Sequence, residues 1–417
     1  MMIRSNNKKI SLPVFIAVSM MFLCGLLQDE IILGLEFILT LLFVRKIRIN
    51  INFLLVLSFV GLFSVGMIFW GTNNPTMMLK QFIGIVITSV FFYTIVDQKN
   101  VTDVFVLGKK WSLFMSIIAI IQQGIVLVHF TDIFLFRIIL YRSNISLHPF
   151  QSYSLYIEPS LFALILSPAA FASLYRLFGK SKVLIANSIK ESEAVIILIA
   201  MLFTISSTGY VGLFFGMLLI LFEYRADSIK RIAYTIGGVM GFIALYVFLN
   251  PVRVRVDAML DSLLHLNRYN KIEMSTLTLT TNFGVALKSI KDTVGLGGGI
   301  GSHGNSYYKY ISDLSHTLSL NAQDGNSMFI RLLSEVGIVG VAVILFLIIR
   351  IYLKIPNNSK EKILCMCCLV YFFMTLLRFG HYFGNGLWLV VIAYYMLYKS
   401  VKESVVFNIM EMDSSGD

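Results

Sequence analysis

Residues 194–222 read AVIILIAMLFTISSTGYVGLFFGMLLILF. The apolar windows 194–208 and 209–222 meet at Ser206, Ser207, Thr208 and Gly209. Each window is short for a membrane-spanning helix, which needs about 20 apolar residues. The two windows therefore form either a tight helical hairpin or one broken helix. The choice matters for the whole chain, because one crossing more or fewer inverts every loop that follows.

The distribution of basic residues favours the hairpin. Cytoplasmic loops of membrane proteins are enriched in Lys and Arg. With the N-terminus in the cytoplasm and two crossings in this stretch, most of the 34 Lys and Arg residues fall in inner loops, and most of the others lie in one long segment. A single crossing would place the later basic clusters, such as Arg225, Lys230 and Arg231, outside.

The composition of the chain is that of a membrane protein. Of its 417 residues 57% are hydrophobic and 14% charged, against about 45–50% and about 25% in soluble domains. We therefore predict an all-α polytopic integral membrane protein with about twelve transmembrane helices, which leaves no room for an extramembrane Rossmann, barrel or kinase domain. The apolar windows are 10–27, 31–44, 53–70, 79–96, 111–130, 155–175, 194–208, 209–222, 232–250, 328–349, 363–377 and 383–398.

Charge and cysteine usage narrow the function classes further. We attribute the net charge of +11 to basic residues that mark the cytoplasmic loops, so we do not expect nucleic acid as a partner. Cys365, Cys367 and Cys368 share one apolar run and Cys24 lies in another, which disfavours disulfides and a metal site. The first apolar run has no small-residue cleavage site after it, so we expect it to be retained as a span.

Four regions follow from this topology. Residues 1–250 hold helices 1 to 9, residues 251–327 form a large external loop, residues 328–398 hold helices 10 to 12, and residues 399–417 form a cytoplasmic tail. Within the loop, apolar spacing predicts short helices over 254–266 and 282–290. The tail is polar and is expected to fray.

Ionisable residues at membrane depth are candidates for function. Glu158, Arg331, Glu335, Arg378 and His381 are all predicted at the outer ends of helices, whereas Glu36 lies deeper. A transporter would place such groups near the membrane midplane. This layer therefore predicts a binding or reaction site at the level of the outer headgroups.

Structural roles are possible for the same residues. Arg331 and Glu335 are spaced i, i+4 and could pair on one helix face. Glu158 precedes a proline and could cap a helix. Arg378 could extend to the membrane interface as an amphipathic side chain.

Further arginines and histidines flank this layer. Arginine binds phosphate through a planar group of donors in fixed positions. Four arginines in predicted outer loops would together suit a lipid pyrophosphate, whereas each one alone could be a solvated charge. They are Arg137, Arg142, Arg253 and Arg255. His303 and His316 could act as general base toward a sugar hydroxyl. The glycine cluster 295–301 either exposes amides to a phosphate or forms a turn. It matches neither a Walker motif nor GxGxxG, and the chain has no HExxH.

Three stretches carry a family resemblance. YIEPSLFA at 156–163, the glycine run at 295–301 and NSMFIRLLSEVGIVG at 326–340 resemble the O-antigen polymerase (Wzy) family, which is related to the O-antigen ligases. The shared plan, many helices with a large external loop before the last few spans, covers nearly the whole chain.

The resemblance implies a metal-independent, cofactor-free membrane glycosyltransferase with a GT-C-like fold. It would transfer a growing glycan from undecaprenyl pyrophosphate to the non-reducing end of another lipid-linked repeat unit in the bacterial inner membrane, with both termini cytoplasmic. The implied partners are that lipid-linked oligosaccharide, membrane lipid and a chain-length regulator protein. Asn326 belongs to the third motif and is a candidate substrate contact.

One position departs from the family pattern. Ligase-like members tend to have His directly before the Asn of the last motif, and here Gly325 stands there, preceded by Asp324. This disfavours the ligase and leaves the general base open among His303, His316, Asp324 and Glu158. The other alternative, a lipid-linked glycan flippase or secondary transporter built of two halves, would place its long connector in the cytoplasm at mid-chain.

Overall fold

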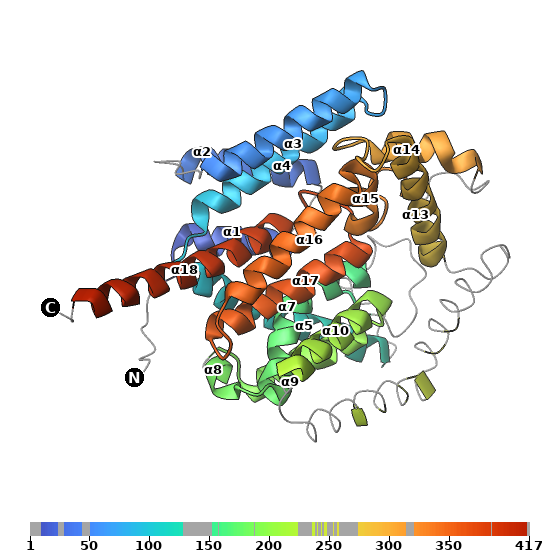
Figure 1. Ribbon diagram of the computed structural model, residues 1–417. Coiled ribbons are helices and arrows are strands. Elements are labelled where there is room, and N and C mark those ends of the chain that lie inside the picture. The colour runs from blue at the N-terminus through green and yellow to red at the C-terminus, as the bar shows by residue number, and fades with distance from the viewer. Residues whose placement is uncertain are drawn as a thin grey trace.

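The computed structural model describes most of the chain, and its regular structure is helical throughout the described residues (Figure 1). They are 10–23, 29–43, 51–127, 152–156, 158–186, 188–223, 274–313, 321–384 and 386–414, with single positions 236, 237, 240, 243, 246, 247, 253 and 257. The helices are α1 (Leu12–Leu23), α2 (Asp29–Phe43), α3 (Ile51–Phe69), α4 (Pro75–Ile95), α5 (Val101–Leu127), α7 (Pro159–Phe178), α8 (Lys182–Ala186), α9 (Glu191–Phe203), α10 (Ser207–Glu223), α13 (Met274–Asp292), α14 (His303–Tyr310), the 3-10 turn η1 (Ile311–Asp313), α15 (Met328–Glu335), α16 (Gly337–Lys354), α17 (Lys360–Arg378) and α18 (Leu387–Ser414).

The stretch 194–222 folds as a helical hairpin, as predicted. Glu191 at the start of α9 pairs with Arg176 near the C-terminal end of α7, at 3.2 Å. Glu223 at the end of α10 accepts a hydrogen bond from Tyr175, also near that end of α7, at 3.1 Å. Since α9 begins and α10 ends beside the same end of α7, the two helices run antiparallel.

Several helices have the length and composition of membrane spans. Among the described residues, Pro75–Ile95, Val101–Ile125, Pro159–Phe178 and Gly337–Lys354 are long and apolar enough to cross a membrane, and Leu12–Leu23, Phe53–Phe69 and Ser207–Glu223 are shorter apolar helices. This is compatible with a polytopic membrane protein. The predicted span 232–250 and the loop helix 254–266 fall outside the described residues apart from single helical positions.

The boundaries of three predicted elements need correction. The predicted helix 328–349 is two helices in the structure, because Gly337 has φ +69° and interrupts the helix between α15 and α16. The predicted loop helix 282–290 is longer and becomes α13. The segment predicted as a frayed tail after residue 398 continues α18 as far as Ser414.

The main core lies between α1, α5, α7, α9, α10, α17, α18 and the C-terminal end of α4, whose buried apolar side chains form one cluster. Figure 1 shows α2, α3 and α4 together on one side of this bundle and α13, α14 and α15 at one end of it. The turn between α3 and α4 contacts the glycine run, since Asn73 Nδ2 donates to the carbonyl of Ile300 at 2.8 Å. The helices that carry the predicted motifs are thus held at a common end.

Candidate functional site

A polar cavity of about 220 Å³ lies at that end of the bundle. Four separate segments line it: the start of α7, the start of α10, the loop 321–326, and the end of α17 with the residues after it. It gathers five residues that the sequence singled out, namely Glu158, Asp324, Asn326, Arg378 and His381. Residues far apart in the chain therefore meet at one place.

Glu158 occupies the N-cap position of α7 with Pro159 at N1, but its carboxylate does not cap the helix. The side chain is exposed and accepts a hydrogen bond from the Ser160 hydroxyl at 3.0 Å. The segment just before it is anchored, because Gln122 Nε2 donates to the carbonyl of Ser154 at 2.6 Å. Glu158 therefore occupies the N-cap position without capping α7 through its side chain, and the residue borders the cavity instead.

Asp324 and His381 form a carboxylate–imidazole pair in the cavity wall, with 2.9 Å between Oδ2 and Nε2. The other oxygen of Asp324 accepts the backbone N–H of Asn326 at 2.9 Å. Burial alone raises the pKa of Asp324, but the hydrogen bond and charge of His381, the amide of Asn326 and the charge of Arg331 together bring that pKa below its usual value. The carboxylate is therefore ionised and fixes the orientation of the imidazole.

Arg331 and Glu335 form an ion pair directly behind this wall. This is the i, i+4 pairing that the sequence offered as their structural role. Their exposed fractions are 1% and 0%, and Nε lies 3.0 Å from Oε1. Arg331 Nη1 donates to the carbonyl of Gly380 at 2.7 Å, and the Tyr382 hydroxyl donates to Glu335 Oε2 at 2.7 Å. Neither charged residue borders the cavity. Instead the pair holds the segment that carries His381.

His303 is buried and also lies outside the cavity lining. Its Nδ1 is 2.8 Å from Ser334 Oγ and its Nε2 is 3.0 Å from Asn282 Oδ1. Burial and the charge of Arg331 lower the pKa of His303 to about 3, so the ring is neutral near pH 7. This placement suits a packing role better than contact with a substrate.

The glycine run 295–301 packs closely against residues 334–337, where α15 ends and α16 begins. Gly298 and Gly299 donate their amides to the carbonyls of Ser334 and Glu335, both at 2.8 Å. Gly297 has φ +81°, and a Cβ there would lie 2.5 Å from the backbone nitrogen of Gly337. These two amides are therefore used within the protein and do not form a phosphate cradle.

The remaining sequence candidates are not in the cavity. Arg253 is an exposed single position that does not line it. Arg137, Arg142, Arg255 and His316 lie outside the described residues. Among the described residues no group of three or more His, Cys, Asp and Glu could hold a metal ion.

Sequence reasoning missed the residues that support the site. Tyr382 and Gly380 flank His381 in the chain, so proximity in sequence was the available signal. A Cβ on Gly380 would collide with the backbone carbonyl of Asp324, so the glycine allows these two segments to meet. Nothing in the sequence singles out Asn282 and Ser334, because each acts through a contact with His303 that exists only in the folded protein.

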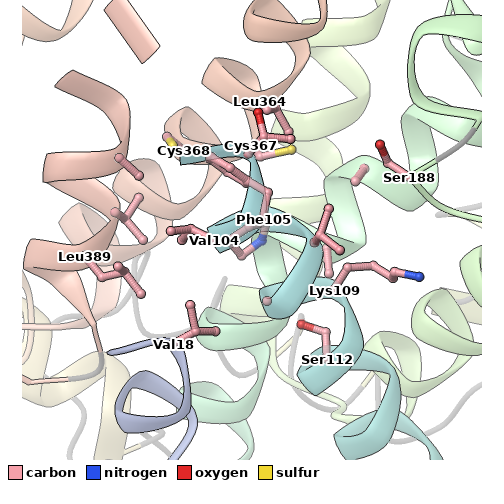
Figure 2. Close-up of a pocket in the computed structure, with 18 of the residues that line it drawn as sticks. Val18, Val104, Phe105, Lys109, Ser112, Ser188, Leu364, Cys367, Cys368 and Leu389 are labelled. Atoms are coloured by element: carbon pink, nitrogen blue, oxygen red, sulfur yellow. The ribbon is translucent and has the colours of Figure 1, made fainter. Parts of the chain in front are cut away.

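A second cavity of about 70 Å³ lies between α1, α5, α7, α17 and α18 (Figure 2). Its lining is largely apolar and includes Val18, Val104, Phe105 and Leu389. Lys109, also in the lining, is paired with Glu193 at 2.9 Å. This cavity offers few groups for acid–base or phosphate chemistry.

A comparison with protein-family models finds no match to the chain, and neither does a comparison with curated proteins. The functional argument therefore depends on the geometry of the polar cavity and on the motifs in the sequence.

Proposed function

We propose that the protein is a membrane glycosyltransferase that polymerises a polysaccharide, moving a glycan from undecaprenyl pyrophosphate to the non-reducing end of another lipid-linked repeat unit. The observation that carries this proposal is the polar cavity, which brings together two carboxylates, an imidazole and a guanidinium from three segments of the chain. All of them stand at or beside helix ends, where a membrane enzyme would meet a lipid headgroup.

The chemistry needs a proton acceptor and a site for negative charge. A hydroxyl of the acceptor sugar attacks the anomeric carbon of the donor, and its proton passes to His381, which Asp324 orients and whose positive charge Asp324 stabilises. The bond from the anomeric carbon to the pyrophosphate oxygen breaks, and undecaprenyl pyrophosphate leaves with the electron pair. Arg378 supplies positive charge in the same cavity for the leaving group.

The wider assignment follows the same proposal. The chain would cross the bacterial inner membrane about twelve times in a GT-C-like arrangement, with both termini cytoplasmic and the cavity on the outer side. A chain-length regulator is the protein partner that we expect, and no cofactor is required.

Two observations support the proposal over its two alternatives. The histidine of ligase-like members would be strained at position 325, because Gly325 has φ +63° and a Cβ there would lie 3.0 Å from His303 Nε2. Glu36 in α2, which a transporter would use near the membrane midplane, is buried, accepts a hydrogen bond from Thr88 of α4 at 2.8 Å and does not line the polar cavity.

The test uses purified full-length protein and defined undecaprenyl-pyrophosphate-linked repeat units, without added metal, and mass analysis of the products. Glu158→Gln, His381→Gln and Arg378→Gln should each lower the rate of chain extension by about a hundredfold or more. The matched controls Glu361→Gln and Arg350→Gln lie on α17 and α16 outside the cavity lining and should retain the rate. Wild-type protein that leaves all repeat units unjoined in this assay would overturn the proposal.

A further inference from the structure

Helix α13 has two contrasting faces. Val285 and Ala286 are fully buried against the rest of the protein. On the opposite face Phe283 and Leu287, spaced i, i+4, are 41% and 49% exposed, and Val294 just beyond the helix is 81% exposed. Contiguous exposed apolar side chains mark an interaction surface.

This surface is continuous with the face of a candidate membrane span. The backbone N–H of Ile338 in α16 donates to the carbonyl of Gly295 at 3.0 Å, directly after Val294. Ile338 and Val339 lie in the first turn of α16, directly after Gly337, and are both exposed. Helix α16 is one of the helices apolar enough to cross a membrane. The exposed apolar stripe of α13 therefore starts where the lipid-facing side of a span would end.

The orientation and charge of α13 also suit a lipid surface. Figure 1 shows α13 running crosswise to α16, so a bilayer crossed by α16 would have α13 along its surface. Lys288 and Lys291 lie beside the apolar stripe, and Lys291 is exposed. Helices that lie in a membrane interface combine an apolar face with flanking Lys or Arg that contact lipid phosphates.

We propose that α13 is an interfacial helix whose Phe283 and Leu287 side chains insert among phospholipid acyl chains, with Val294 beside them and Lys288 and Lys291 at the phosphates. The occupant of this surface is lipid and not a second protein, because the same apolar surface continues onto α16. The inference does not depend on the proposed enzymatic function. It places the surroundings of the polar cavity at headgroup level.

The experiment measures the surroundings of single spin labels on full-length protein reconstituted in phospholipid nanodiscs that contain phosphatidylglycerol. Cys365, Cys367 and Cys368 are buried, so only Cys24 is replaced by serine before a new cysteine is introduced. Labels at Phe283→Cys and Leu287→Cys are compared with Ile338→Cys as the lipid reference and with Ser312→Cys, an exposed loop-side position, as the water reference. Collisions with oxygen report lipid, and collisions with a neutral nickel chelate report water.

Labels at positions 283 and 287 should give oxygen-to-nickel accessibility ratios close to that of position 338 and several-fold above that of position 312. Ratios equal to that of position 312 would overturn the proposal, because the stripe would then face water. Low accessibility to both reagents would also overturn it, since this pattern indicates a protein partner. The references and circular dichroism of each variant confirm that the fold is retained, and no outcome depends on glycosyltransferase activity.

Discussion

Arg331 offers the sharpest test of how the site is built. Its guanidinium donates to Glu335 and to the carbonyl of Gly380 and lies over the Tyr382 ring, with 4.2 Å to the ring centroid. All of these contacts are internal, so we expect the residue to stabilise the segment that bears His381 and not to bind substrate.

The magnitude follows from the burial of both partners. Arg331→Met removes both hydrogen bonds and leaves Glu335 buried with one polar contact, from Tyr382. Breaking a buried ion pair by removing one partner costs about 3–5 kcal/mol. Arg331→Lys keeps the charge but loses the planar fork, and it should cost about 1.5–3 kcal/mol, the range for a hydrogen bond to a charged group. Arg331→Met combined with Glu335→Gln should cost less than the sum of the two single changes, because no lone charge is left buried.

Equilibrium unfolding in mixed detergent micelles, followed by circular dichroism, gives the free energy of unfolding for each variant. Activity in the same variants should fall with stability and should recover in part at lower temperature. If Arg331→Met unfolds within about 0.5 kcal/mol of wild type and yet loses all binding of the lipid-linked donor, then the arginine contacts substrate and the positioning argument is wrong.

Three further predictions concern other parts of the chain. Burial lowers the pKa of His303 from 6.5 to about 3, so between these pH values the unfolded chain binds more protons than the folded protein. The free energy of unfolding should therefore fall as the pH drops below 6.5, by up to about 1.4 kcal/mol per pH unit. In urea titrations His303→Gln should flatten this pH dependence, and an unchanged dependence would assign it to another group. Gly380→Ala should lower the extension rate by displacing the backbone at Asp324, measured beside the unfolding free energy, and wild-type activity would show that the close approach is not needed. In spheroplasts, a cysteine at Ser312 should react with an impermeant thiol reagent and one at Asn187 should not, and the reverse labelling would invert the topology.

The helical fold could be predicted because apolar length is a local property of the sequence. The windows around α4, α5 and α7 and the α9–α10 hairpin all correspond to helices. The break at Gly337 combines the positive φ of that glycine with its close approach to Gly297, which lies forty positions earlier, and the sequence does not show this approach. Local pattern carries no information about such a contact.

Part of the candidate site could be predicted, because residue type and nearness to a helix end are also local properties of the sequence. Glu158, Asp324 and His381 could be proposed from residue type and from their positions near helix ends, and the cavity brings them together. The sequence could not show that Arg331 and His303 face inward, because burial depends on how helices pack. Charge and spacing therefore identified the residues of this region but could not separate those at the cavity from those behind it.

The length of α18 has a practical consequence. Its 28 residues span about 42 Å at 1.5 Å per residue, whereas a bilayer core is about 30 Å thick. Just past the middle of the helix, Gln98 in the turn between α4 and α5 donates to Glu403 of α18 at 2.9 Å and holds this part of α18 in place. A small marker domain fused to α18 through an uninterrupted helix would inherit this fixed direction, and it would give electron cryomicroscopy a rigid feature for aligning particles of the protein.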